Sequence, residues 1–188
     1  MKKFSKSIVL RMLIALFTIA SITGCQGGSD NGTKEGTATN APKVETETYT
    51  VTDEKEGITM TFEVPKIDGI EVKDLGDRVG YRIAYEEGGW RLDVEPDLIN
   101  ADSMRAKMSD EEKVTYGDNN CYVEYGSWAA HGRFDFGASK ESNINVAVEF
   151  DLRPEDTYQP DDEDELRGYM EDENVGIIFA SLNAETVE

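Results

Sequence analysis

The fold is decided by the stretch Ile58-Thr59-Met60-Thr61-Phe62-Glu63-Val64-Pro65, in which apolar and polar side chains alternate. Alternation with a period of two places the apolar side chains on one face of a strand and the polar side chains on the other. Pro65 has no backbone N–H to donate to a neighbouring strand, so it ends the pattern. The stretch therefore predicts a β-strand with one buried face and one face in water.

Weaker copies of this alternation recur along the chain and predict further strands. They lie around residues 49–51, 79–85, 90–94, 116, 121–125, 134–138 and 144–152. Glycine-rich or Asn/Asp-rich turns at 86–89, 117–120 and 139–143 join successive strands and predict β-hairpins. Residues 97–113 break the alternation and predict either a short helix or an excursion over the sheet.

The pattern changes after Pro154 to a helical period. An acidic run at 161–165 predicts a helix start, because acidic side chains stabilise the positive end of the helix dipole. A last helix, ending near Asn183, is predicted from apolar residues at i, i+3, i+4 and i+7: Val175, Ile178, Phe179 and Leu182. Residues 48–188 are thus expected to form one α+β domain, a mostly antiparallel β-sheet built from successive hairpins with the C-terminal helix packed on one face.

The N-terminus has the order of a bacterial secretory signal. A basic start at residues 1–6 is followed by an apolar run at 12–24, which is shorter than the roughly 20 residues of a membrane-spanning helix. The run ends in Ile22-Thr23-Gly24-Cys25, which resembles the lipobox of bacterial lipoprotein precursors. The resemblance implies that residues 1–24 are a cleaved signal peptide, recognised through Ile22, Thr23 and Gly24, and that Cys25 carries lipid. An ordinary signal with a nearby cysteine is the alternative.

Residues 25–47 are rich in Gly, Ser, Thr and Asn and predict a flexible tether between the lipidated Cys25 and the domain. The expected location is the cell membrane, lipid-anchored on its extracytoplasmic face, or the outer membrane if the source has one. The chain carries 39 acidic and 19 basic residues, a formal net charge of -20. Nucleic acid is therefore not an expected partner, since its recognition depends on Lys and Arg at phosphates.

The layout of the predicted domain is similar to PsbP-like lipoprotein domains. The resemblance rests on a first strand that ends in Val64-Pro65, on the successive hairpins, and on a last helix with the sequence Ile-Ile-Phe-Ala-Ser-Leu at 177–182. It implies a role in binding or assembly. That family has no common catalytic set, so the resemblance assigns no site residues.

Residues with catalytic or metal-binding chemistry are few. His131 is the single histidine, in a segment expected between two strands, and no spacing typical of a hydrolase or a zinc site occurs. Cys121 is interpreted as a small buried residue, with a nucleophile paired to His131 or an intermolecular disulfide as alternatives. The acidic run at 161–165 has Leu166 where a calcium loop needs glycine, which favours a helix start over cation binding. We predict no catalytic residue, no metal ligand and no cofactor.

Trp128, His131 and Arg133 are a candidate ligand or partner surface, because Trp and Arg are enriched at interfaces. The alternative is that the aromatic residue belongs to the core, as aromatic residues in strands more often do. The expected function is that of a non-catalytic binding or interaction module, held at the membrane by its lipid, for an unknown protein or small molecule. Two alternatives remain: a structural or assembly factor of the cell envelope, and an enzyme that uses two carboxylates.

Overall fold

A computed structural model describes residues 44–108, 111–141, 143–156, 160 and 162–187 of the chain. The predicted lipid-attachment residue Cys25 and the cleavage residues Ile22, Thr23 and Gly24 lie outside the described residues, as does most of the predicted tether. Residues Ala41–Glu188 form a compact unit by themselves.

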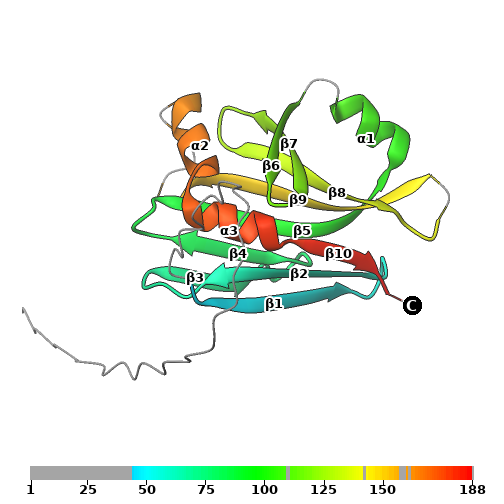
Figure 1. Cartoon of the computed structure of the whole chain (residues 1–188), viewed down its shortest axis with the longest axis horizontal. Helices are drawn as coiled ribbons and strands as arrows, with labels where there is room; N and C mark the ends of the chain where they lie inside the picture. The colour runs from blue at the N-terminus through cyan, green and yellow to red at the C-terminus, as the bar shows by residue number, and fades with distance from the viewer. Residues whose placement is uncertain (1–43, 109–110, 142, 157–159, 161, 188) are drawn as a thin grey trace, which may run out of the picture. The chain divides into compact units, whose positions relative to one another are not determined.

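The strands of this unit form two antiparallel sheets (Figure 1). The three-stranded sheet has the order β1-β2-β10, with β1 at Thr46–Asp53, β2 at Ile58–Pro65 and β10 at Asn183–Thr186. The seven-stranded sheet has the order β3-β4-β5-β9-β8-β7-β6. Its strands are β3 (Ile70–Asp74), β4 (Tyr81–Tyr85), β5 (Trp90–Asn100), β6 (Glu112–Tyr116), β7 (Asn119–Tyr125), β8 (Ala130–Ala138) and β9 (Ile144–Pro154).

The predicted fold class is confirmed, since successive hairpins build mostly antiparallel sheets and the C-terminal helices pack against them. The decisive stretch forms β2, and its apolar side chains are buried on one face. The predicted hairpins appear as β4–β5, β6–β7 and β8–β9. Two strands, β3 and β10, were not predicted, and the strands divide between two sheets rather than forming the single sheet that was expected.

Three helices occur among the described residues: α1 (Ala101–Met108), α2 (Glu163–Met170) and α3 (Glu173–Ser181). The first confirms the helical alternative for the irregular segment. The acidic runs start the other two, as expected for the 161–165 run: the side chain of Asp162 accepts a hydrogen bond from the Glu165 N–H at 3.0 Å. Asp172 does the same for the N–H of Asn174 at 2.8 Å.

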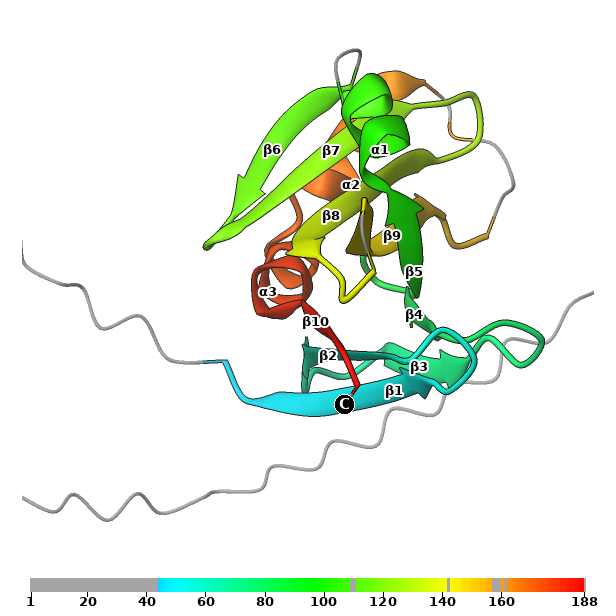
Figure 2. The same cartoon turned by 90° about the vertical axis from the view of Figure 1, so that its right-hand side faces the viewer.

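Helix α3 lies between the two sheets, packed against β2 of one and β6 of the other (Figure 2). Its Phe179 is fully buried, with its ring centroid 4.7 Å from Phe150 and 5.1 Å from both Phe134 and Tyr116. The helical spacing that predicts the last helix therefore reflects real burial, because Val175, Ile178 and Phe179 all face the core. One helix face thus joins both sheets into one hydrophobic core.

Candidate functional site

The outer face of the seven-stranded sheet is charged. The alternation that buries Leu92 and Val94 on the inner face of β5 directs Asp93 and Glu95 to the other side. The charged side chains on this face come from β4, β5, β8 and β9: Arg82, Arg91, Asp93, Glu95, His131, Arg133, Glu149, Asp151 and Arg153.

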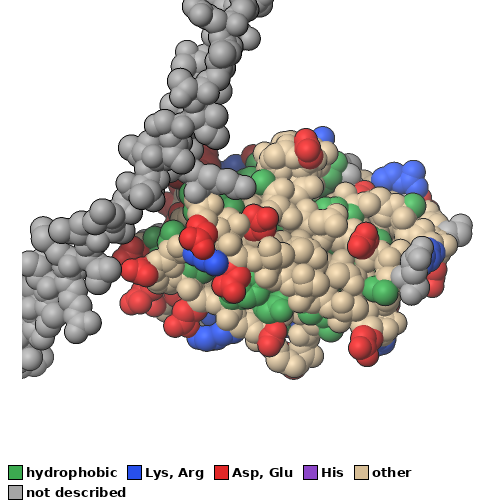
Figure 3. All heavy atoms as spheres, turned by 60° about the horizontal axis from the view of Figure 1, so that its bottom comes forward, with side chains coloured by type: hydrophobic (Ala, Val, Ile, Leu, Met, Phe, Trp, Pro, Cys, Tyr) green, Lys and Arg blue, Asp and Glu red, His purple; other side chains and the backbone are tan. Residues whose placement is uncertain are grey.

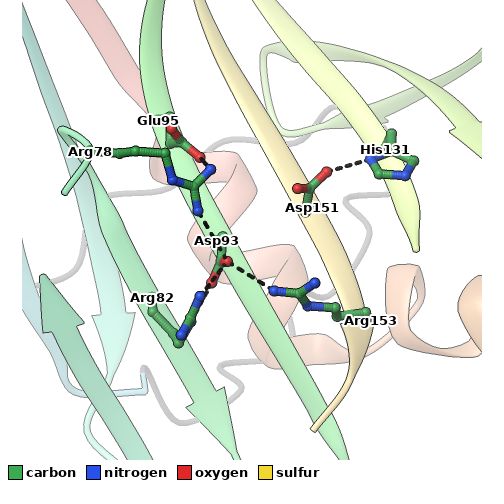
Figure 4. A network of polar contacts seen from close by, with 7 residues as sticks. All are labelled: Arg78, Arg82, Asp93, Glu95, His131, Asp151 and Arg153. Atoms are coloured by element: carbon green, nitrogen blue, oxygen red, sulfur yellow. Dashed lines mark hydrogen bonds and ion pairs between the residues drawn. The ribbon is translucent and has the colours of Figure 1, made fainter. Parts of the chain in front are cut away.

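Asp93 lies at the centre of this face and is 1% exposed (Figure 4). Its carboxylate accepts hydrogen bonds from Arg82 Nε at 2.7 Å and Arg82 Nη2 at 2.8 Å, a bidentate arrangement. Arg153 Nη2 donates at 3.3 Å, and Arg78 Nη2 lies 3.8 Å away. The buried negative charge is thereby compensated by arginines of the protein itself, which is the arrangement of a structural ion pair rather than of a site awaiting a ligand.

Like charges nevertheless stand directly opposite each other on β5 and β9. The register pairs Asp93 with Asp151 and Glu95 with Glu149. Directly opposed like charges destabilise a sheet. Burial raises the pKa of the Glu95 carboxyl, and Asp151 raises it further, although Arg78 opposes the shift.

Of the predicted surface residues, the structure brings Trp128 and His131 together. Their rings lie 4.4 Å apart in an edge-on arrangement, and the guanidinium of Arg153 lies 5.5 Å from the Trp128 ring centroid. Trp128 is 40% exposed. Arg133 has a different environment, because it is 8% exposed and its Nη2 donates to Glu111 at 2.7 Å.

The expectation that His131 lies between strands is wrong, because it lies in β8, with Nδ1 in contact with Asp151. Only the part of β8 from 134 to 138 was predicted. Its first residues were missed because Ala130 and Gly132 occupy the inward positions there, where larger apolar residues would have extended the period. Gly132 is needed there: a Cβ would lie 2.3 Å from Cζ of Phe150. His131 borders a polar cavity of about 220 Å³, which is also lined by Arg78, Glu95, Gly132, Arg133, Glu149, Phe150 and Asp151.

Cys121 is fully buried on the inner face of β7, which confirms the interpretation as a core residue. Burial raises the pKa of its thiol well above the ordinary value, so a reactive thiolate is disfavoured. It stands opposite Phe134 in the register, whereas His131 lies on the other face of β8. A Cys121–His131 nucleophile pair is therefore not formed.

A larger cavity, of about 570 Å³, lies between the β6–β7 hairpin and helices α2 and α3. We call it the β6–α3 groove. Its lining residues are Glu112, Val114, Tyr116, Tyr125, Arg167, Met170, Glu171, Asp172, Glu173, Gly176, Ile177 and Ala180. The volume falls within the range of roughly 300–1,000 Å³ that is typical of ligand pockets, and most of its walls are apolar or aromatic.

Hydrogen bonds hold the walls of the β6–α3 groove in place. The hydroxyl of Tyr116 donates to the carbonyl oxygen of Met170 at 2.7 Å, which ties β6 to the end of α2. The side chain of Asn119 donates to the carbonyl oxygens of Phe179 and Leu182, at 2.9 and 2.8 Å, and so ties the hairpin to the end of α3. The groove is therefore built into the fold, with both of its walls fixed.

The mouth of the groove is acidic. Arg167 lies over the Tyr125 ring, 4.0 Å from its centroid, and donates to Glu112 at 2.8 Å and Glu163 at 2.7 Å. Its positive charge is thereby matched by two carboxylates, while the turn between α2 and α3 adds acids at 171–173. Acidic side chains also occur at many points on the face drawn in Figure 3, where apolar side chains form only small separate areas.

The groove was not predicted, because its walls come from residues 112–125 and 167–180, which are far apart in the sequence. One signal was present. The helical spacing turns Val175, Ile178 and Phe179 to the core, which leaves Ile177 as a large apolar residue away from that face. An apolar residue on the wrong side of an amphipathic helix indicates a second contact surface.

No group of three or more His, Cys, Asp or Glu side chains among the described residues is placed to hold a metal ion. The helices of the described segments are also too short or too polar to cross a membrane. Comparisons of the chain with protein families, with characterised proteins and with solved structures found no match. The resemblances to lipoprotein precursors and to PsbP-like domains stay predictions.

Proposed function

We propose that this chain is a membrane-anchored extracytoplasmic lipoprotein whose domain is a non-catalytic binding module, with the β6–α3 groove as its ligand site. The observation that carries the proposal is the groove itself, a preformed cavity of about 570 Å³ with mostly apolar walls. The anchor is supported by the sequence Ile22-Thr23-Gly24-Cys25. A structural or assembly role in the envelope would use the same groove with one fixed protein partner.

The carboxylate-dependent enzyme remains a second candidate because of one observation. Glu95 and Glu149 are opposed in register beside the 220 Å³ polar cavity, and burial raises the pKa of Glu95, as a general acid requires. The other charged groups of this face favour a structural role, since Asp93 and its arginines compensate one another. We therefore propose the β6–α3 groove, and not the polar cavity beside Glu95, as the ligand site.

The test of the groove uses the unit Ala41–Glu188 and the neutral apolar dye N-phenyl-1-naphthylamine, whose fluorescence rises in apolar pockets. Ile177→Arg places a charge in the groove wall, and Val187→Arg makes the same change at an exposed position. We expect saturable dye binding that Ile177→Arg weakens at least about tenfold, a loss of roughly 1.4 kcal/mol. Val187→Arg should bind the dye like the wild type. If the wild type and Ile177→Arg bind the dye with equal affinity, the β6–α3 groove is not the ligand site.

The test of the anchor is metabolic labelling with palmitate in a bacterial host. We expect label on the wild-type chain and none on Cys25→Ala, because the thiol is the only attachment point that the lipobox resemblance provides. Persistent labelling of Cys25→Ala would overturn the lipoprotein assignment. The outcome is independent of dye binding, so the two parts of the proposal are tested separately.

A further inference from the structure

Strand β6 is an edge strand next to the β6–α3 groove. It stands last in the order of the seven-stranded sheet and, among the described residues, pairs with β7 alone. The loop between them has two residues, and Gly117 adopts φ +57°, as the first loop residue of a type II′ turn requires. An edge strand of this kind offers unpaired backbone groups to another chain.

The register shows which groups are free. In a two-residue hairpin the residues next to the loop, here Tyr116 and Asn119, form a hydrogen-bonded pair, and every second pair after it does the same. Lys113 and Thr115 therefore direct their backbone N–H and C=O groups to the open edge. The side chains of Val114 and Tyr116 line the groove, so a chain that pairs with this edge would place alternate side chains in it.

The charges around the groove select among ligands. Glu112 and the acids at 171–173 line it, while the single lining arginine, Arg167, is already paired with Glu112 and Glu163. An anionic ligand such as a phosphate or an acidic lipid headgroup would be repelled there. Lysine and arginine side chains would be attracted.

The helix wall leaves room for an apolar side chain. A Cβ added at Gly176 would meet nothing within 4 Å, and Ala180 also presents only a small side chain. Ile177 supplies the apolar contact between them. The groove thus has an open backbone edge beside it, an apolar recess in its helix wall and acidic side chains in its lining.

We propose that the β6–α3 groove binds an extended peptide that adds a strand to β6 and carries an apolar side chain flanked by Lys or Arg on its groove-facing side. This inference rests on the proposed function, since it names the class of ligand for the same groove. Backbone pairing supplies affinity and the recess and rim supply specificity, as in other cases of strand addition. The partner is accordingly a basic segment of another protein.

The probe is the synthetic peptide Thr-Lys-Thr-Leu-Thr-Lys-Thr, acetylated and amidated, in which Leu and both Lys fall on one face of a strand. Two matched peptides accompany it. One has Glu in place of both Lys, and the other is N-methylated at every backbone amide, so that it has no N–H to donate from either of its edges. Binding to the unit Ala41–Glu188 is measured by titration calorimetry at low salt. We expect both matched peptides to bind at least about tenfold more weakly than the probe.

The matched protein variant is Thr115→Pro. Because the N–H of Thr115 faces the open edge and not β7, proline is compatible with folding at this position, and it blocks strand addition. We expect Thr115→Pro to keep binding N-phenyl-1-naphthylamine and to lose the probe peptide. A probe that binds the wild type no better than its N-methylated form overturns strand addition while leaving the dye result intact. Failure of the dye to bind the wild-type groove would instead overturn the proposed function beneath it.

Discussion

Replacement of Asp93 tests whether the buried ion-pair network on the outer face of the sheet stabilises the fold. Asp93→Asn removes the negative charge and keeps the size of the side chain. Arg82 and Arg153 would then lose a carboxylate that accepts hydrogen bonds from both of them. The two guanidinium groups would remain close together beside a third, Arg91, which stands opposite Arg153 in the register.

The expected loss follows from burial. Breaking a buried ion pair by removing one partner typically costs about 3–5 kcal/mol, because the remaining charge is left uncompensated. Asp93 is almost fully buried, but the side chain of Arg82 is 37% exposed and that of Arg153 is 13% exposed, so water compensates part of the loss. We therefore expect a decrease of about 3 kcal/mol in the free energy of unfolding.

The assay is urea unfolding of the unit Ala41–Glu188, followed by tryptophan fluorescence, because Trp90 is fully buried and becomes exposed on unfolding, whereas Trp128 is already 40% exposed. With a slope of about 2 kcal/mol per molar urea, the midpoint of Asp93→Asn should fall by about 1.5 M. The control is Arg78→Gln: Arg78 is 47% exposed and 3.8 Å from Asp93, so its loss should cost less than about 1 kcal/mol. If Asp93→Asn costs no more than Arg78→Gln, the network does not stabilise the fold in the way described.

Three further predictions concern other parts of the molecule. Because burial raises the pKa of the Cys121 thiol, the folded unit should not react with a thiol reagent such as dithionitrobenzoate at neutral pH, and it should react once urea unfolds it. Rapid reaction of the folded form would contradict this. Because burial raises the pKa of Glu95, its contribution to stability is complete below the ordinary glutamate pKa of about 4.3 and is lost as the pH rises through the folded value. Urea unfolding should thus show that Glu95→Gln is at least as stable as the wild type at neutral pH, and that the two are equally stable in acid. A variant less stable than the wild type at neutral pH would contradict the raised pKa of Glu95. Gly132→Ala should lose about 2 kcal/mol of unfolding free energy, because its Cβ would meet the Phe150 ring. The control is Gly168→Ala in helix α2, where a Cβ would meet nothing within 4 Å, and it should gain up to about 1 kcal/mol. Equal effects of the two substitutions in thermal melts would contradict the close packing at Gly132.

Local patterns predicted most of the strands, because hairpins combine a period of two with turn residues in one short segment. The hairpin β4–β5 is the clearest case, with Gly88 and Gly89 between two alternating runs. Strand β3 was missed since it has only two apolar residues, Ile70 and Val72, and β10 was missed since only Ala184 of its four residues is buried. Short strands such as these are stabilised by their neighbours and not by their own composition.

Long-range arrangement could not be predicted in the same way. The split into two sheets depends on β10 returning to β2, and no local period encodes that pairing. The candidate surface was predicted only in part: Trp128 and His131 do meet, but Arg133 belongs to a separate ion pair with Glu111. The β6–α3 groove is formed by two segments whose proximity only the folded chain establishes.

The pairing of β10 with β2 has a consequence for how the protein is made. The last strand completes a sheet begun by one of the first, and Ser181 Oγ accepts from the N–H of Glu63 across 118 positions of the chain. During synthesis on the ribosome, one edge of β2 stays unpaired until β10 has emerged. Its apolar stretch is then an open template for association with other nascent chains. We therefore expect a chain truncated before residue 183 to aggregate more readily than one that contains β10, as light scattering during refolding would measure.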